Sequence, residues 1–312
     1  MEVRLQTLLT KFSEIPISFG GASISGEGAG YGFGDITETE AVKLLHYSFE
    51  RGIKIYDTAP IYGFGESERR IGKAFGKKRD EVFIISKSGV TWDKNRRVDM
   101  SNDPRVTEAM LIQSLKDLNT EYIDLYMVHW PDARVDIRRP LEVLAKAKRQ
   151  GKIGHIGLCN THQDDFSKAS EIEKIEVLQS QLNFFEQEAV GSVLPLCKEF
   201  GASFMSWGTL DKGILTGRVT RERKFDKDDC RSWAPWWKQM DKESKFKKMD
   251  KIVPLLREKE FTPLELALSY NLSHPEVTTL LCGARNAGQL DSILDGLKNR
   301  VPKAEIEVLL KI

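Results

Sequence analysis

The chain has 312 residues, of which 40% are hydrophobic and 9% aromatic, so it can bury one large core, and we expect a single domain over residues 1–312. Its 47 lysines and arginines against 46 aspartates and glutamates leave a formal net charge of +1, which gives no field that favours nucleic acid or an acidic membrane surface. A small-molecule substrate is the simpler expectation.

The cysteines and the N-terminal residues bear on the compartment. Cys159, Cys197, Cys230 and Cys282 are widely spaced and form no C-x-x-C pair, which is typical of reduced thiols and not of a disulfide framework. Residues 1–12 lack the basic-then-apolar pattern of a signal peptide, and no run of 18 apolar residues occurs. We therefore expect a cytoplasmic protein.

Short apolar runs alternate along the chain with charged stretches of helical period. The eight predicted strands are Ile15–Phe19, Ile53–Thr58, Val82–Ser86, Ile123–His129, His155–Cys159, Val177–Gln181, Ser203–Trp207 and Thr278–Cys282. Predicted helices begin near Thr37, Ser67, Pro104, Ile137, Gln163, Ala189, Pro263 and Ala287. Eight strands each followed by a helix favour an α/β fold of the closed (β/α)8 TIM-barrel type over an open doubly wound sheet.

Three segments depart from this alternation. A glycine-rich stretch, Gly20–Gly34, follows the first strand, and a polar insertion with three tryptophans, Phe225–Met249, follows the seventh. Both are expected to be long loops at the C-terminal face of the barrel, because they follow strands there. The last stretch, Pro302–Ile312, is expected to form an extra helix at the C-terminus.

Three neighbouring strands end in an ionisable residue. Two-residue alternation extends the apolar rows of the second, third and fourth strands to Asp57, Lys87 and His129. In a barrel such rows fill the interior and end at the face that carries active sites, so these three side chains are expected to converge. For any one of them a purely structural role is the alternative, but their occurrence on adjacent strands favours a shared site.

Tyr62 lies five residues after Asp57, in a turn that Pro60 and Gly63 can bend back over the barrel mouth. A packed surface ring is the alternative interpretation. An ammonium at Lys87 would favour the phenolate and lower the pKa of Tyr62, while Asp57 would keep that lysine charged. We therefore predict a phenol whose pKa is shifted toward neutral pH and which acts as a general acid.

Several motifs together resemble the aldo-keto reductase superfamily, in particular its bacterial and potassium-channel β-subunit-like branch. They are Tyr56-Asp57-Thr58-Ala59-Pro60-Ile61-Tyr62-Gly63-Phe64-Gly65-Glu66-Ser67-Glu68, Ser86-Lys87, Val128-His129-Trp130-Pro131-Asp132, Gly151-Lys152-Ile153 and Gly157-Leu158-Cys159-Asn160. The resemblance spans nearly the whole chain. It implies that Tyr62 protonates a carbonyl oxygen, that Lys87 and Asp57 tune the phenol, and that His129 orients the carbonyl.

The resemblance also implies a nicotinamide cofactor. Its nicotinamide amide would be held by Asn160 and Gln179 with Cys159 beside them, and its ring would stack on Trp207. Its pyrophosphate would follow Leu210 to Gly217, with Gly213 and Gly217 allowing close backbone approach, and its adenosine end would meet Gly283, Arg285 and Gln289. Because Arg285 suits a 2′-phosphate, NADP is favoured and NAD remains possible.

The sequence departs from the family pattern at four places, one of which is Leu182, where many relatives have an aromatic residue. Cys159 stands where serine is usual, which puts a weak thiol in place of a hydroxyl donor. The family's opening hairpin is not recognisable in Met1–Glu14, so we expect the closed end of the barrel to be capped differently. The small residues Gly20-Gly21-Ala22 predict a wide substrate entrance.

Two other kinds of site are disfavoured by the sequence. The chain has no G-x-G-x-x-G and no P-loop, which disfavours a Rossmann or Walker-type site. His155, Cys159 and His162 have zinc-ligand chemistry, but alternation puts the first two at opposite ends of one strand, so no metal is expected.

The leading function is hydride transfer between NADP(H) and an aldehyde or ketone, or the corresponding alcohol or sugar hydroxyl. A slow NADP(H)-sensing regulatory subunit and a lyase or isomerase with a Schiff base at Lys87 are the alternatives. We expect no nucleic-acid or membrane partner, and the oligomeric state stays open.

Overall fold

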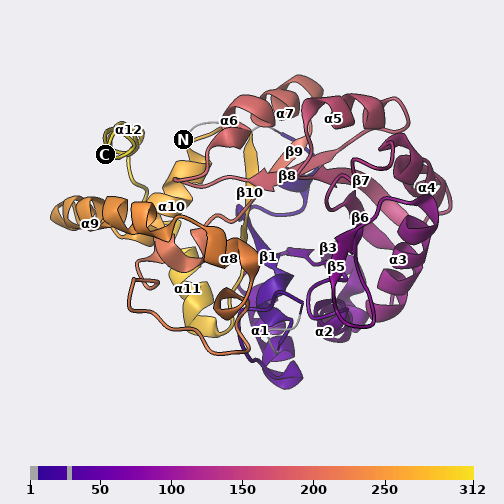
Figure 1. Cartoon of the computed structure of the whole chain (residues 1–312), viewed down its shortest axis with the longest axis horizontal. Helices are drawn as coiled ribbons and strands as arrows, with labels where there is room; N and C mark the ends of the chain where they lie inside the picture. Colours follow the sequence, from indigo (N-terminus) through magenta and orange to yellow (C-terminus); the bar gives the residue numbers. More distant parts are fainter. Residues whose placement is uncertain (1–5, 27–29) are drawn as a thin grey trace.

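Eight parallel strands close into a barrel, in the order β1-β10-β9-β8-β7-β6-β3-β2 (Figure 1). The structure is a computed structural model that describes residues 6–26 and 30–312. The barrel strands are β1 (Ile17–Gly20), β2 (Ile55–Asp57), β3 (Phe83–Ser88), β6 (Ile123–Val128), β7 (Ile153–Cys159), β8 (Val177–Gln181), β9 (Ser203–Trp207) and β10 (Val277–Cys282). Each predicted strand overlaps with one of these, which confirms the (β/α)8 fold.

Helices surround the barrel and connect its strands (Figure 1). They are α1 (Glu38–Glu50), α2 (Glu66–Phe75), α3 (Pro104–Asp117), α4 (Arg138–Arg149), α5 (Gln163–Ser170), α6 (Glu188–Ser192), α7 (Leu194–Phe200), α8 (Pro235–Gln239), α9 (Lys242–Glu258), α10 (Pro263–Leu272), α11 (Ala287–Gly296) and α12 (Lys303–Leu309). Local sequence explains several of their starts. Thr37 and Glu40 form a capping box on α1, and Thr262 and Glu265 form one on α10, where Pro263 occupies the first turn.

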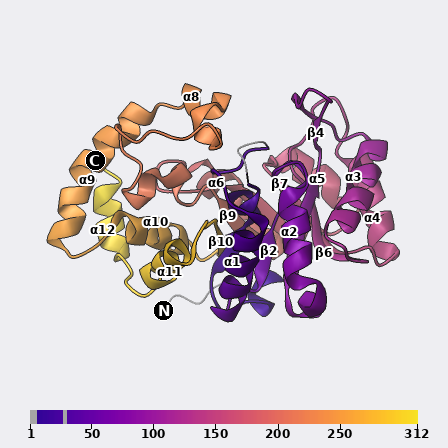
Figure 2. The ribbon, with the colours of Figure 1, turned by 90° about the horizontal axis from the view of Figure 1, so that it is seen from below.

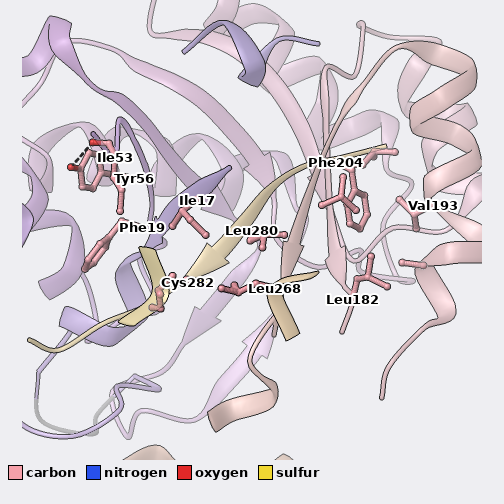
Figure 3. Packing of buried hydrophobic residues seen from close by; sticks show 14 of the residues in the cluster. Ile17, Phe19, Ile53, Tyr56, Leu182, Val193, Phe204, Leu268, Leu280 and Cys282 are labelled. Carbon is pink, nitrogen blue, oxygen red and sulfur yellow. Dashed lines mark hydrogen bonds between the residues drawn. The ribbon is translucent and has the colours of Figure 1, made fainter. Parts of the chain in front are cut away.

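Apolar side chains fill two regions separated by the barrel wall. Inward-facing residues such as Ile55, Ile85 and Met127 form one buried cluster inside the barrel. A larger cluster lies between the strands and the helices, and Figure 3 shows Phe19, Tyr56, Phe204 and Leu280 within it. Alternate residues of one strand thus serve different cores, because successive side chains point to opposite faces.

A short 3-10 turn, η1 (Leu9–Lys11), caps the N-terminal end of the barrel. Leu9 is fully buried in the interior cluster, and its backbone N–H donates to Ser203 Oγ at 3.0 Å. The hydroxyl of Ser203 in turn donates to Thr7 Oγ1 at 2.8 Å. Among the described residues, this turn is what caps the closed end of the barrel; residues 1–5 of the predicted segment lie outside the described residues.

The opposite end carries the long insertions. The predicted Gly20–Gly34 stretch contains the 3-10 turn η2 (Gly21–Ile24), and its residues 27–29 lie outside the described residues. An antiparallel hairpin of β4 (Val90–Trp92) and β5 (Val98–Met100) follows β3, and Figure 2 shows β4 projecting on the same side as α8. The predicted polar insertion contains η5 (Cys230–Ser232), α8 and the start of α9. The predicted C-terminal helix is α12, which packs against α10. Within the described ranges, no helix is long and apolar enough to cross a membrane.

Candidate active site

Lys87 and Asp57 form a buried ion pair at the C-terminal end of the barrel. Lys87 Nζ lies 2.7 Å from Asp57 Oδ1 and 2.8 Å from Oδ2, and it also donates to the carbonyl oxygen of Thr58 at 2.9 Å. The strands β2 and β3 are parallel neighbours in which Asp57 is level with Ile85, and Lys87 lies two residues further along β3 on the same face, within reach of Asp57. Burial lowers the pKa of Lys87, but attraction to Asp57 and other neighbouring groups outweighs burial, so the net pKa is raised and the ammonium stays charged.

Tyr62 lies in the loop between β2 and α2, above this pair. Lys87 Nζ is 5.5 Å from the centre of the phenol ring, and the ring of His129 stands almost perpendicular to it with centroids 6.0 Å apart. Burial raises the pKa of Tyr62 to about 12, although the Lys87 cation acts in the opposite direction. The prediction of a phenol shifted toward neutral pH is therefore wrong in its net direction, because loss of water around the phenolate outweighs the nearby cation. At neutral pH the phenol carries its proton.

His129 follows the last residue of β6 and is buried. Burial, with Lys87 as a second cause, holds the pKa of His129 well below its ordinary value, so the imidazole is neutral at physiological pH. Its backbone is fixed on both sides: its N–H donates to the carbonyl of Ser88 at 2.8 Å, and its carbonyl accepts from Asn160 Nδ2 at 3.0 Å. A neutral imidazole can donate one N–H to a substrate oxygen.

A chain of hydrogen bonds crosses the barrel mouth from Asp57 to Trp207. Gln179 Nε2 donates to Asp57 Oδ2 at 2.8 Å, and the Cys159 thiol donates to Gln179 Oε1 at 3.2 Å. Asn160 Nδ2 lies 3.1 Å from Cys159 Sγ, and Trp207 Nε1 donates to Asn160 Oδ1 at 2.8 Å. Burial raises the pKa of Cys159, so it remains a thiol. Because the amide N–H groups are engaged, the spare capacity of Gln179 and Asn160 is mainly as acceptors.

A cavity of about 1230 Å³ opens over this end of the barrel. Three of the four predicted catalytic residues line it, namely Asp57, Tyr62 and His129, while Lys87 lies behind Asp57 and is fully buried. The predicted cofactor residues that line it are Cys159, Asn160, Gln179, Trp207, Leu210, Gly213, Gly283, Arg285 and Gln289. The structure thus brings these residues to one cavity.

Gly217 differs from the other predicted cofactor residues. It ends the 3-10 segment η4 (Asp211–Thr216) with φ 72°, a conformation that favours glycine, and a Cβ there would meet Pro263 at 3.2 Å. Its neighbours Thr216 and Arg218 line the cavity in its place. Its glycine is therefore explained by the backbone turn and not by approach to a ligand.

Four cations that sequence reasoning missed also line the cavity: Lys212, Arg218, Arg223 and Arg231. Arg231 is held by Asp229, with Nη2 and Oδ2 2.6 Å apart, and its Nη1 donates to the carbonyl of Lys212 at 2.7 Å. Lys212 lies inside the predicted Leu210–Gly217 segment, so the sequence could have identified it as a residue of the cofactor site. The arginines lie in or next to the long insertion, where sequence does not fix which side chains turn inward.

The three residues of the alternative zinc motif are not brought together as a ligand set. His155 Nδ1 lies 2.8 Å from Glu176 Oε2, while Cys159 is bonded into the chain of amides at the other end of β7. Among residues 6–26 and 30–312, no group of three or more histidine, cysteine, aspartate or glutamate side chains is arranged to hold a metal ion.

Comparison with known proteins agrees with this architecture. The Aldo/keto reductase family matches residues 16–312. Aldo-keto reductase YhdN of Bacillus subtilis (strain 168) is 35% identical over 266 residues, 84% of this chain and 80% of that protein. NADH-specific methylglyoxal reductase of Escherichia coli (strain K12) is 25% identical over 289 residues, 88% of each. The structure of glycerol dehydrogenase AKR11B4 from Gluconobacter oxydans superposes with a TM-score of 0.81 at 28% identity, covering 95% of this chain and 91% of that one. The chain therefore belongs to the aldo/keto reductase family and is an oxidoreductase that uses a nicotinamide cofactor.

Proposed function

We propose that this protein transfers a hydride between NADP(H) and an aldehyde or ketone, or the corresponding alcohol, with Tyr62 as general acid and base. The observation that carries the proposal is the position of the protonated Tyr62 phenol. It lies beside the Lys87–Asp57 ion pair and the neutral His129, at the wall of the large cavity. These groups match the needs of carbonyl reduction, in which the oxygen gains negative charge and then a proton.

The side chains have distinct parts in this mechanism. The cofactor, when bound, supplies the hydride. Tyr62 donates its phenolic proton to the carbonyl oxygen as charge develops there, and the Lys87 ammonium stabilises the phenolate that remains. Asp57 keeps Lys87 charged and fixed by accepting its N–H bonds at 2.7 and 2.8 Å. The neutral imidazole of His129 donates a hydrogen bond that orients the same oxygen.

The cavity fits a dinucleotide in size and in donor set. Asn160 and Gln179 offer acceptor oxygens for a carboxamide N–H₂ group, and the Trp207 indole offers a face for an aromatic ring. Lys212 and Arg231 place cationic side chains along the segment proposed for the pyrophosphate.

For the cofactor's adenosine end we propose a preference for NADP over NAD, supported by Arg218, Arg223 and Arg285 on the cavity wall. Glu265 and Asp295 line the same cavity and, as carboxylates, would repel a 2′-phosphate. The relative from Escherichia coli is NADH-specific by name. The preference is tested by comparing kcat/KM for NADPH and NADH in the parent and in Arg285→Leu. Loss of a charge-assisted contact worth about 1.5–3 kcal/mol predicts a fall of tenfold or more for NADPH only. An equal fall in kcat/KM for both cofactors would show that Arg285 does not recognise the 2′-phosphate.

The function itself is tested by following cofactor oxidation with a panel of aldehydes, ketones and sugars. Oxidation that requires the carbonyl compound supports the proposal. Tight NADPH binding without turnover on any compound would support the sensing subunit instead.

We further propose that the chain acts as one domain in the cytoplasm. All four cysteines are free and buried, which suits a reducing compartment.

A further inference from the structure

The cavity wall differs in charge from one part to another. The part built by η4, the long insertion and the loop before α11 carries cations, among them Lys212 and Arg285. The part next to Tyr62 and His129 is built by the β4–β5 hairpin, the loop after β6 and the loop after β2, and its lining includes Ile61, Val90, Val98, Met100 and Trp130. None of these five side chains carries a charge.

The hairpin turns one face to this part of the cavity. Val90 pairs with Met100, and Trp92 pairs with Val98, so these four side chains share a face. Val90, Val98 and Met100 line the cavity, and Val90 belongs to the same apolar cluster as Tyr62. Val98 and Met100 are 39% and 42% exposed, so they present apolar surface that a bound molecule would cover.

Hydrogen bonds fix the hairpin to the loop that follows β6. Asn102, two residues after β5, is buried; its Oδ1 accepts from the Asp132 N–H at 2.7 Å and its Nδ2 donates to the Trp130 carbonyl at 3.1 Å. Arg134 Nε donates to Asp132 Oδ1 at 2.7 Å, and its guanidinium also donates to the carbonyl of Met100. Since the same loop follows His129, the hairpin is held at a fixed position relative to the catalytic groups.

We propose that the β4–β5 hairpin selects the substrate, with Val98 and Met100 contacting the part of a carbonyl compound that does not react. The inference rests on the proposed function and narrows it to uncharged carbonyl compounds that carry an extended apolar or aromatic group. Burial of each methylene group against such a wall contributes about 0.8 kcal/mol, or about fourfold in kcat/KM. A carboxylate or phosphate group placed there would lose its water, and the nearby Arg134 is already paired with Asp99 and Asp132.

The test compares substrate ratios in the parent, Met100→Ala, Met100→Lys and the control Thr91→Ala, which alters the opposite face of the same hairpin. In the parent, kcat/KM is expected to rise from propanal to octanal, and benzaldehyde to exceed para-carboxybenzaldehyde. Met100→Ala should lower the octanal-to-propanal ratio by roughly tenfold, since truncation removes apolar contact area. Met100→Lys should raise the ratio of para-carboxybenzaldehyde to benzaldehyde by at least about tenfold, since it supplies the missing cation.

Several outcomes overturn the inference. They are equal kcat/KM for propanal and octanal in the parent, a parental preference for the carboxylated aldehyde, or ratios in both Met100 variants that match those of Thr91→Ala. If no aldehyde is reduced, the proposed function fails separately. Substrate selection by the hairpin is then tested by measuring the affinities for methyl hexyl ketone and acetone by calorimetry, with NADP⁺ present so that no hydride is available. If the longer ketone binds more tightly and Met100→Ala reduces this difference, substrate selection by the β4–β5 hairpin is supported. Equal binding of the two ketones refutes it.

Discussion

Glu68 should make the stability of this protein depend on pH near neutrality. It lies in α2, is fully buried, and accepts a hydrogen bond of 2.6 Å from the hydroxyl of Ser86. Burial raises the pKa of this carboxyl from 4.5 to about 7, and the hydroxyls of Ser86 and Ser114 oppose burial only in part. The folded protein therefore holds the proton more tightly than the unfolded chain. The contribution of the protonated Glu68 carboxyl to stability is complete below about pH 4.5 and is lost as the pH rises to about 7. The gap between these two values corresponds to about 3 kcal/mol.

The substitution Glu68→Gln keeps the shape of the side chain and removes its titration. Relative to the parent, the variant should gain about 2–3 kcal/mol in free energy of unfolding between about pH 5 and about pH 9. Equilibrium urea unfolding across this range, followed by circular dichroism, measures the difference. Glu142→Gln, on an exposed position of α4, is the control and should show no pH-dependent difference from the parent. Parallel pH profiles for Glu68→Gln and the parent would refute the account of a buried, protonated carboxyl.

Two further substitutions test the groups around the phenol. Lys87→Met leaves Asp57 as a buried carboxylate without its cation, so it should lower kcat by orders of magnitude and cost about 3–5 kcal/mol of stability, measured by steady-state kinetics and urea unfolding. An unchanged kcat would mean that the ion pair is only structural. Trp207→Ala removes the proposed stacking face and should weaken NADPH binding by roughly tenfold, measured by fluorescence titration. Equal NADPH affinity in variant and parent would show that the indole does not contact the nicotinamide ring.

The barrel could be predicted because its strands combine short apolar runs with regular spacing between helices. The β4–β5 hairpin could not, since each strand has only three residues and the turn between them, residues 93–97, is entirely polar. Its position depends on Asn102 and Asp132, which meet only after β6 has packed beside β3. The cap by Leu9 could not be predicted either, because no local sequence pattern indicates that this side chain packs inside the barrel.

The arrangement of the candidate site was more predictable than its electrostatics. Strand alternation was enough to place Asp57 and Lys87 on the same face of parallel neighbouring strands, with Lys87 two residues beyond Ile85, the register partner of Asp57. The pKa of Tyr62 was not predictable in the same way, since it depends on how completely Ile61 and Val90 exclude water from the loop. Charge neighbours can be inferred from a motif, whereas burial requires the packed structure.

The central claim is that the Tyr62 phenol supplies the proton to the carbonyl oxygen. The most direct measurement is kcat/KM for carbonyl reduction by Tyr62→Phe, together with the affinity of the same variant for NADPH. The ring is kept and only the hydroxyl is removed, so we predict a fall of several orders of magnitude in kcat/KM with nearly unchanged NADPH affinity. Activity close to that of the parent would contradict the claim.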